Sequence, residues 1–421
     1  MVRIKGWLLA GAASFALAAC GPTETAEAPA PETPAAPAVA LDLTPDPADG
    51  DGGVSAFYSD PVPAGDLKPG QLIRSEILEP EKALAEAGQA FRMMYVSTDG
   101  LEGTKPVLVS GAVFLPKGEP PAGGWPLMAW AHGTVGVADV CAPSNNPRSE
   151  RDTKYLNHWL SQGYAVVASD YQGLGAPGGH PYLATKPEAY SVLDSIRAVQ
   201  SGDMPVSDAV VLVGQSQGGG AAFATAAVAD AYAPELDIRG TVATGTPYFT
   251  ATTAPATRDP DAVSPVLGYT IYILDLVRQA DPAFDPADYL SPEGMKLWEL
   301  SRTACYGQVA RAIVDGGISQ NKAIAVDTTP IASKYYGLMS YDTLKVKGPV
   351  FMGTGGQDRD VPPEGQQRLV NDACAAGSVI QHHIYPDLDH SGAVNGSLAD
   401  STPFVAKAFA GEAITGNCPT K

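Results

Sequence analysis

Short runs of apolar residues alternate with amphipathic stretches through the first half of the chain. The apolar runs predict β-strands, and apolar residues at helical spacing predict helices between them. The expected strands are residues 91–96, 107–115, 127–131, 164–169, 209–214 and 240–246, and the expected helices are 155–162 and 188–200. This alternation is typical of right-handed βαβ units, so we expect an α/β fold with a mostly parallel sheet and helices on both faces.

The alternation stops between residues 247 and 347, a segment rich in Pro, Asp and Tyr. Strand-like runs return at 349–353 and 379–385, and a closing helix is expected near 403–411. An interruption of this size predicts a helical cap over the carboxyl edge of the sheet, where sites in open α/β sheets lie. The predicted domains are a catalytic domain at 57–246 and 348–421 and a cap or lid insertion at 247–347.

The N-terminus has the layout of an export signal. Arg3 and Lys5 precede the apolar segment 7–19, which is too short for an ordinary membrane-spanning helix. The segment runs into Leu17-Ala18-Ala19-Cys20, which resembles a bacterial lipobox, where the signal is cut before a cysteine that is then lipidated. We expect a signal peptide at 1–19 and a lipid on Cys20. The alternative is a plain secretory signal cut after an alanine, and either one exports the protein.

The residues after Cys20 predict a tether. Residues 21–52 are mainly Pro, Ala, Thr and acidic residues, which have almost nothing to bury. We therefore expect a disordered, lipid-anchored tether at 20–56, with ordered structure beginning near Phe57. Gly21, rather than an acidic residue, follows the cysteine, and by resemblance to bacterial lipoproteins this favours the outer membrane.

One motif joins a predicted strand to a predicted helix. Gly214-Gln215-Ser216-Gln217-Gly218 follows the apolar run 210–213 and precedes the small-residue run 219–232. In a strand, turn and helix setting, G-x-S-x-G forms a nucleophile elbow, whose strained turn holds the serine above the sheet edge. An ordinary glycine turn with a solvated serine is the alternative, and the flanking strand and helix argue against it. We predict Ser216 as nucleophile and the amide of Gln217 as an oxyanion donor.

A serine nucleophile needs a base and an orienting carboxylate, here expected in the order Ser, acid, His. Asp358 lies in the turn after the expected strand 349–353, and His390 lies in the loop after the strand 379–385. The residues between them leave room for one helix and one strand, as the topology requires. Asp360 is the alternative acid, but the D-x-x-V-P pattern places the acid at its first position.

The other histidines have structural interpretations. His382 and His383 lie in an expected strand and face opposite sides of it. With Asp387 and Asp389 they suggest a metal site, but no ligand pair at a recognised spacing accompanies them, so we expect no metal. Surface or packing roles are also expected for His158 and His180.

A second oxyanion donor normally comes from the loop after an early strand. Trp130-Ala131-His132-Gly133-Thr134 meets this requirement, because the strand 127–131 runs into it. We expect the amide of Thr134 to donate, with Gly133 as the alternative donor. A purely structural glycine turn is the competing interpretation, against which stands the need for two donors around one oxygen.

The net charge argues against a nucleic-acid partner, and the number of cysteines indicates an oxidising compartment. The 421 residues carry a formal net charge of −19, which makes nucleic acid an unlikely ligand. With Cys20 assigned to lipid, an even number of cysteines remains, namely Cys141, Cys305, Cys374 and Cys418. In an exported protein this predicts two disulfides, for which three pairings are possible.

Several motifs together carry a family resemblance. They are Trp130-Ala131-His132-Gly133-Thr134 with Cys141-Ala142-Pro143-Ser144, Ser169-Asp170-Tyr171-Gln172-Gly173-Leu174-Gly175, Leu193-Asp194-Ser195-Ile196-Arg197-Ala198 and Gly214-Gln215-Ser216-Gln217-Gly218-Gly219. This conjunction resembles the secretory lipase family of α/β-hydrolases, known from fungal triacylglycerol lipases. The tether and the lipobox are not part of the fungal pattern, and the cap carries no motif that matches it.

The resemblance implies an α/β-hydrolase fold with a helical cap and lid, and the triad Ser216, Asp358 and His390. It also implies that Cys141 pairs with Cys305 and Cys374 with Cys418, and that Asp170 and Asp194 are structural.

The leading hypothesis is a serine ester hydrolase of lipase or carboxylesterase type that forms an acyl-enzyme on Ser216 and needs no cofactor. Its expected partners are an ester substrate and the membrane that holds the anchor. A serine peptidase or amidase on the same fold is one alternative, and a non-catalytic lipid-anchored binding module is another.

Overall fold

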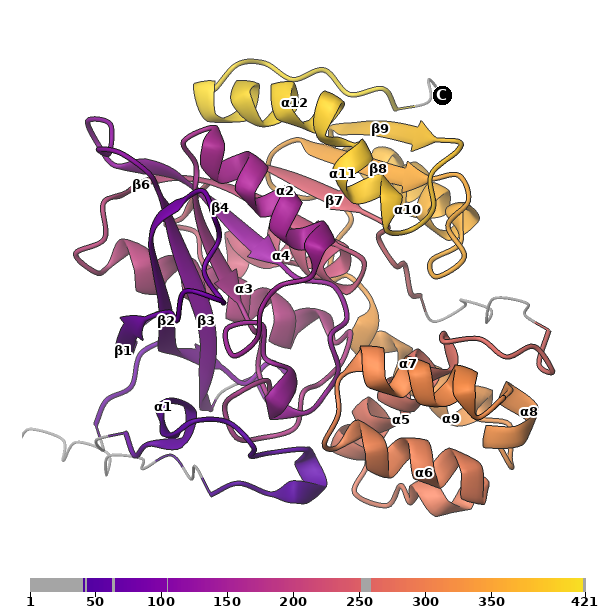
Figure 1. The fold of residues 1–421 in the computed structure, drawn as a ribbon. Coiled ribbons are helices and arrows are strands. Elements are labelled where there is room, and N and C mark those ends of the chain that lie inside the picture. Colours follow the sequence, from indigo (N-terminus) through magenta and orange to yellow (C-terminus); the bar gives the residue numbers. More distant parts are fainter. Residues whose placement is uncertain (1–40, 42–43, 63–64, 104, 251–258, 419–421) are drawn as a thin grey trace, which may run out of the picture. The chain divides into compact units, whose positions relative to one another are not determined.

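The computed structural model describes residues 41, 44–62, 65–103, 105–250 and 259–418. Within these residues nine strands form one sheet (Figure 1). Their bounds are β1 (Leu72–Ile77), β2 (Ala87–Thr98), β3 (Pro106–Pro116), β4 (Trp125–Ala131), β5 (Ala165–Ser169), β6 (Val206–Gln215), β7 (Asp237–Thr244), β8 (Val350–Gly355) and β9 (Ile380–Tyr385).

The strand order is β1-β2-β3-β5-β4-β6-β7-β8-β9. The pairs β1 with β2, β2 with β3, and β3 with β5 are antiparallel. Every neighbouring pair from β5 to β9 is parallel. The predicted mostly parallel sheet of an α/β-hydrolase is therefore confirmed.

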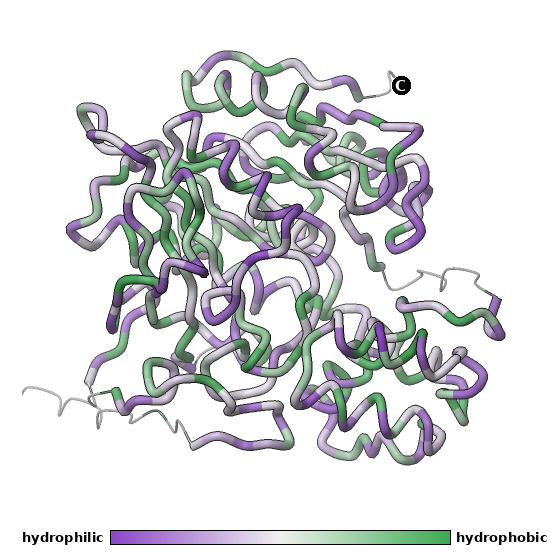
Figure 2. The backbone as a smooth tube through the Cα atoms, in the orientation of Figure 1, coloured by the Kyte–Doolittle hydropathy of each residue, from purple (hydrophilic) through white to green (hydrophobic). Residues whose placement is uncertain are grey.

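Both faces of the sheet are covered by helices, which is why its central strands are apolar without alternation. In β6, Val210 and Leu212 pack in one hydrophobic cluster with residues of α3 (Thr185–Gln200) and α4 (Gln217–Tyr232). Val211 and Val213, which point the other way, pack with residues of α2 (Glu150–Ser161) and α12 (Leu398–Ala410). Figure 2 shows the hydrophobic colour gathered along the strands and the hydrophilic colour on the loops.

Between β7 and β8 the chain forms a helical insertion, here called the cap. Its helices are α5 (Leu267–Ala280), α6 (Pro292–Ser301), α7 (Tyr306–Asp315), α8 (Gln320–Ala323) and α9 (Thr329–Lys334), which lie together in Figure 1. They share a hydrophobic cluster of their own, which includes Ile271, Leu274, Trp298 and Ile313. The cap therefore has its own core, and this core accounts for many of the apolar residues of the insertion.

Two disulfides link distant parts of the chain, Cys141 with Cys305 and Cys374 with Cys418. This is the pairing that the family resemblance implies. The first bridge ties the residue before α7 to the body. Next to it the amide of Tyr306 donates to the carbonyl of Val135 at 2.7 Å.

Three short or C-terminal helices complete the fold. They are α1 (Ala56–Ser59), α10 (Pro363–Ala375) and α11 (Gly392–Gly396). Helix α10 connects β8 to β9 and follows the turn that carries Asp358. It is the helix for which the sequence leaves room between the acid and the base.

Residues 44–56 differ from the predicted tether, because they are ordered on the body. Asp49 pairs with Arg278 of α5 at 2.6 Å, and the carboxylate of Asp51 accepts the amide of Gly178 at 3.0 Å. These acidic residues, which in the sequence suggest a solvated chain, are thus bonded to an arginine and to a backbone amide of the body. The prediction of disorder up to residue 56 does not hold for this part.

The predicted signal peptide at 1–19, Cys20 and the tether as far as residue 40 lie outside the described residues. Among the residues that are described, none of the helices combines the length and the apolar character needed to cross a bilayer.

Candidate active site

Ser216 occupies the sharp turn between β6 and α4. Its backbone has φ 59° and ψ −123°, a left-handed conformation that is costly for a residue with a side chain. A Cβ on Gly214 would overlap the carbonyl of Gly218, and a Cβ on Gly218 would overlap the carbonyl of Ala131. The two glycines of the motif are thus required by backbone packing, and the strained turn is the geometry of a nucleophile elbow.

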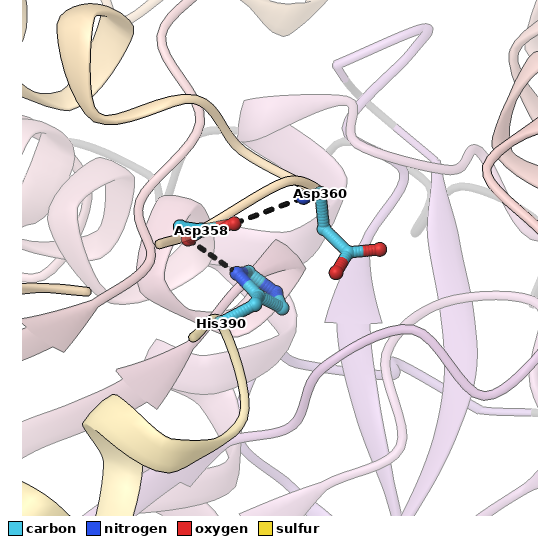
Figure 3. Close-up of side chains that lie close together, drawn as sticks. All are labelled: Asp358, Asp360 and His390. Carbon is cyan, nitrogen blue, oxygen red and sulfur yellow. Dashed lines mark hydrogen bonds and ion pairs between the residues drawn. The ribbon is translucent and has the colours of Figure 1, made fainter. Parts of the chain in front are cut away.

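His390 and Asp358 form a buried pair. The Nδ1 atom of His390 lies 2.7 Å from Oδ2 of Asp358 (Figure 3). The side chains are 8% and 0% exposed, so water competes little for this bond. Because Oδ2 is an acceptor, Nδ1 carries the proton and Nε2 is left as the basic atom. This is the protonation state that a general base beside a serine requires.

Asp360, the alternative acid, is joined to Asp358 through its backbone. Its amide donates to Oδ1 of Asp358 at 3.0 Å, as the dashed line in Figure 3 marks. Its carboxylate accepts a bond from the hydroxyl of Tyr269 on cap helix α5 at 3.2 Å. The structure thus brings Asp358, rather than Asp360, into hydrogen-bond contact with His390.

The same three residues are the candidate metal ligands in the described part of the chain. Possible ligand atoms of Asp358, Asp360 and His390 lie within 4.8 Å of one another. However, Nδ1 of His390 donates to Asp358, whose carboxylate also accepts backbone amides. A cation would have to break this pair, so the donor set fits an acid and base pair better than a metal centre.

The strand histidines have structural partners. The Nε2 atom of His382 lies 3.0 Å from Oγ1 of Thr354, and the ring of His383 stacks on Phe351. Outside the strand, Nε2 of His158 lies 2.9 Å from Oγ1 of Thr402. These contacts agree with the structural interpretations of the sequence.

Gln215 is a site residue that the sequence analysis missed. Its side-chain amide nitrogen lies 3.0 Å from Nε2 of His390, the atom expected to take the proton of Ser216. Since Nε2 is the acceptor in this tautomer, Gln215 donates to it. In this structure the base is therefore held by Gln215 as well as by Asp358. The variable position of G-x-S-x-G gives no signal from which this contact could be inferred.

The loop after β4 lies beside the nucleophile. A Cβ built on Gly133 would lie 2.5 Å from Oε1 of Gln215 and 3.5 Å from Cβ of Ser216, so this glycine leaves room for the Gln215 side chain next to the serine. The hydroxyl of Thr134 bonds to the hydroxyl of Tyr182 at 2.6 Å. Gln217 is the first residue of α4, where amides have no partner within the helix. The predicted oxyanion donors, the amides of Gln217 and of Thr134 or Gly133, therefore come from the helix after Ser216 and from the loop after β4.

Behind the elbow, the Gln217 side chain is held by two buried acceptors. Its amide nitrogen donates to Oε1 of Glu188 at 2.8 Å and to Nε2 of His180 at 2.9 Å. Burial raises the pKa of Glu188 to about 8, against the hydrogen bonds from Gln217 and Leu183. Burial likewise lowers the pKa of His180 to about 4. Both groups are neutral at neutral pH, and His180 is a buried polar residue rather than a surface one.

Two aspartates of the family motifs are buried away from the triad. Asp170 accepts bonds from the amide of Ser144 at 2.9 Å and the hydroxyl of Ser110 at 2.7 Å. Asp194 accepts bonds from Ser97 at 2.7 Å and Arg197 at 2.8 Å. Their partners fix loops and helix α3, which matches the structural role that the resemblance implies.

A cavity of about 970 Å³ opens onto Ser216 and Gln217. One wall comes from α5, where Leu267, Thr270, Ile273 and Leu274 recur at helical spacing. Another comes from the acid loop and the start of α10, which contribute residues such as Asp360 and Pro362. The cap thus supplies much of an apolar wall beside the elbow.

Comparison with known proteins finds lipases among the proteins that resemble this chain. The family model for secretory lipase matches residues 143–321, which include Ser216. Lipase A of Moesziomyces aphidis is 26% identical over 379 residues, covering 84% of this chain and 79% of its own. A Mycobacterium tuberculosis protein described as a probable inactive lipase is 28% identical over 204 residues, 44% of each chain.

Among solved structures, Candida antarctica lipase A superposes with a TM-score of 0.71 at 24% sequence identity, covering 90% of this chain and 89% of its own. This similarity shows the shared fold, and the match of the secretory lipase model to residues 143–321 agrees with the resemblance that the sequence motifs indicate.

Proposed function

We propose that this protein is a serine ester hydrolase of lipase or carboxylesterase type. Two observations carry the proposal: the strained Ser216 lines a cavity with apolar residues of the cap, and a buried, hydrogen-bonded pair of His390 and Asp358 supplies a base and its orienting acid. Ligand sites of this kind are mostly apolar with a few placed polar groups. Esters with an apolar acyl chain fit such a site.

In the proposed mechanism, Ser216 Oγ attacks the ester carbonyl while Nε2 of His390 takes its proton. The resulting imidazolium is stabilised by Asp358 through Nδ1. The amides of Gln217 and of Thr134, or of Gly133, hold the oxyanion. His390 then protonates the leaving alcohol, and water activated by His390 frees the acid from the acyl-enzyme. Before attack, His390 must exchange its bond to Gln215 for one to Ser216.

The test is hydrolysis of p-nitrophenyl butyrate together with labelling by a fluorophosphonate. Ser216→Ala should abolish both while leaving the fold intact. His390→Ala should lose several orders of magnitude in kcat, since triad residues act as a unit. Asp358→Asn should lose somewhat less, and Asp360→Asn serves as the matched control that retains most activity. If Asp358→Asn kept full activity and Asp360→Asn were inactive, the assignment of the acid would be reversed.

Two other functions are distinguished by the same assays. A peptidase or amidase on this fold would turn over peptide or anilide substrates faster than the matched esters. The relative described as probably inactive makes a binding module without turnover a second candidate. Wild-type protein that neither hydrolyses esters nor reacts with the fluorophosphonate would support that candidate.

We further propose that the protein is exported and held in the cell envelope by a lipid on Cys20, in the outer membrane. The lipobox-like Leu17-Ala18-Ala19-Cys20 and Gly21 support the anchor. The two disulfides support export, because such bonds persist in oxidising compartments.

A further inference from the structure

The carboxylate of Asp358 is held by more than His390. Its Oδ1 accepts the backbone amides of Asp360 at 3.0 Å and Val361 at 2.8 Å. Its Oδ2, which accepts Nδ1 of His390, also accepts the side-chain amide of Gln366 at 3.0 Å. Two donors therefore share the oxygen that faces the base, and one of them is a side chain to which no role has been assigned.

Gln366 is fixed in one orientation. It lies on α10, is 1% exposed, and donates its second amide hydrogen to the carbonyl of Val361 at 2.7 Å. Its Oε1 lies 2.9 Å from the hydroxyl of Thr354. If the oxygen and nitrogen of this side-chain amide exchanged places, Oε1 would face two acceptors, the Asp358 carboxylate and the Val361 carbonyl. The NH₂ group of Gln366 must therefore face Asp358.

The hydrogen-bond chain continues to the edge of the sheet. Thr354, 1% exposed on β8, donates its hydroxyl to Gln366 and so accepts from Nε2 of His382 on β9. Burial, with a smaller effect of His383, lowers the pKa of His382, which favours the neutral ring. Because the Thr354 hydroxyl already donates to Gln366, the proton of this ring lies on Nε2. Each group in this chain thus donates a hydrogen bond to the next, from His382 to Thr354, to Gln366 and finally to Asp358.

We propose that Gln366 is a positioning residue of the active site, which fixes the Asp358 carboxylate against His390 and moderates the basicity of His390. This inference rests on the proposed function. A hydrogen bond to Oδ2 withdraws negative charge from the oxygen that stabilises the imidazolium. Charged and titratable groups placed beside the His390 ring are Asp358 and Asp360, the latter bonded to Tyr269 of α5.

The test compares Gln366→Leu with Gln367→Leu, which removes the neighbouring amide that bonds Asn371 at the surface. Gln366→Leu should lower kcat for p-nitrophenyl butyrate roughly 10- to 100-fold, as loss of a hydrogen bond to a charged group does, with little change in KM. Without the amide, more negative charge remains on Oδ2, which stabilises the imidazolium form of His390 more strongly relative to the neutral ring. The acidic limb of the pH profile of kcat should therefore move to higher pH, whereas Gln367→Leu leaves both values unchanged.

Gln366→Glu is the second variant, used if the leucine variant does not fold. Its carboxylate places an added negative charge near His390, so the acidic limb should move further in the same direction. Thr354→Val should give a smaller shift, because it frees the oxygen of Gln366 without removing the amide.

The outcomes separate the two proposals. An inactive wild-type protein, or an active Ser216→Ala, overturns the proposed function. An active wild type that depends on Ser216, with wild-type pH profiles in folded Gln366→Leu and Gln366→Glu, overturns the role of Gln366. The role of Gln366 is also overturned if the variant has fewer active sites that react with the fluorophosphonate but an unchanged pH profile. That result indicates loss of folded protein only.

Discussion

Glu188 is a carboxyl group that the fold keeps protonated at neutral pH. It is 2% exposed, and its pKa rises from an ordinary 4.5 to about 8 because burial disfavours the charged form. Between these values the folded protein holds a proton that the unfolded chain has released. The contribution of Glu188 to stability is therefore full below pH of about 4.5 and is lost as the pH rises through about 8.

Glu188→Gln removes this titration and keeps an oxygen that can accept the bonds from Gln217 and Leu183. The variant should gain stability relative to the wild type as the pH rises from 5 to 8, by as much as about 1.4 kcal/mol for each unit of pKa shift. The midpoint of urea unfolding at both pH values measures this. A difference between the two proteins that is the same at pH 5 and pH 8 would show that Glu188 does not titrate in this range.

Single residues differ in how far a sequence reveals them. Ser216, Asp358 and His390 were predicted because each follows a strand in the chain order of an α/β-hydrolase, and the structure places Asp358 and His390 in contact. Gln215 and Gln366 were not, since a glutamine at the end of a strand or in a helix carries no local sign of its partner. The first contact exists only once the end of β6 meets the loop after β9, and the second only once α10 packs on the turn after β8.

At the scale of elements, the cap determines what the cavity can hold. Leu267, Thr270, Ile273 and Leu274 of α5 line it next to the elbow. Each CH₂ buried against such a wall contributes up to about 0.8 kcal/mol, or about fourfold in kcat/KM. We expect kcat/KM to rise with acyl length from acetate to medium-chain esters and then to level off when the cavity is filled.

Ile273→Trp should fill part of the cavity and lower kcat/KM for octanoate esters more than for acetate esters. Val314→Trp is the control, because Val314 lies on α7 with 52% of its surface exposed and does not line the cavity. Activity that peaks at acetate in the wild type and falls with every added carbon would contradict the acyl-pocket interpretation and indicate a short-chain esterase.

Elements were predictable where burial imposes a pattern. The central strands β4 to β8 are buried on both faces, and their apolar runs gave their positions to within a few residues. Strand β1 was missed because it lies at the edge, and its burial pattern ends in three exposed residues. The segment 44–56 was misjudged because its order depends on Arg278 and Gly178, which are far away in the sequence.

At the scale of the whole molecule, the ordered body begins shortly after the expected anchor. Cys20→Ser should move the protein from the membrane fraction to the soluble exported fraction, because one lipid chain or more is then missing from the N-terminus. Fractionation of cells and N-terminal sequencing of the mature protein measure this. Wild-type protein recovered free of membranes, with an N-terminus other than Cys20, would contradict the prediction.

The two disulfides also divide the chain into rings. The bond between Cys141 and Cys305 closes a loop with a sequence separation of 164, which contains Ser216, and the bond between Cys374 and Cys418 closes one of 44, which contains His390. Asp358 lies on the linear stretch between them. In the chain-entropy model these closures stabilise the fold by about 5 and about 4 kcal/mol. An oxidised chain that unfolds therefore keeps the proposed nucleophile and the proposed base in separate closed loops. A chain made in a reducing compartment lacks both loops and must bring the three proposed catalytic residues together from one open chain.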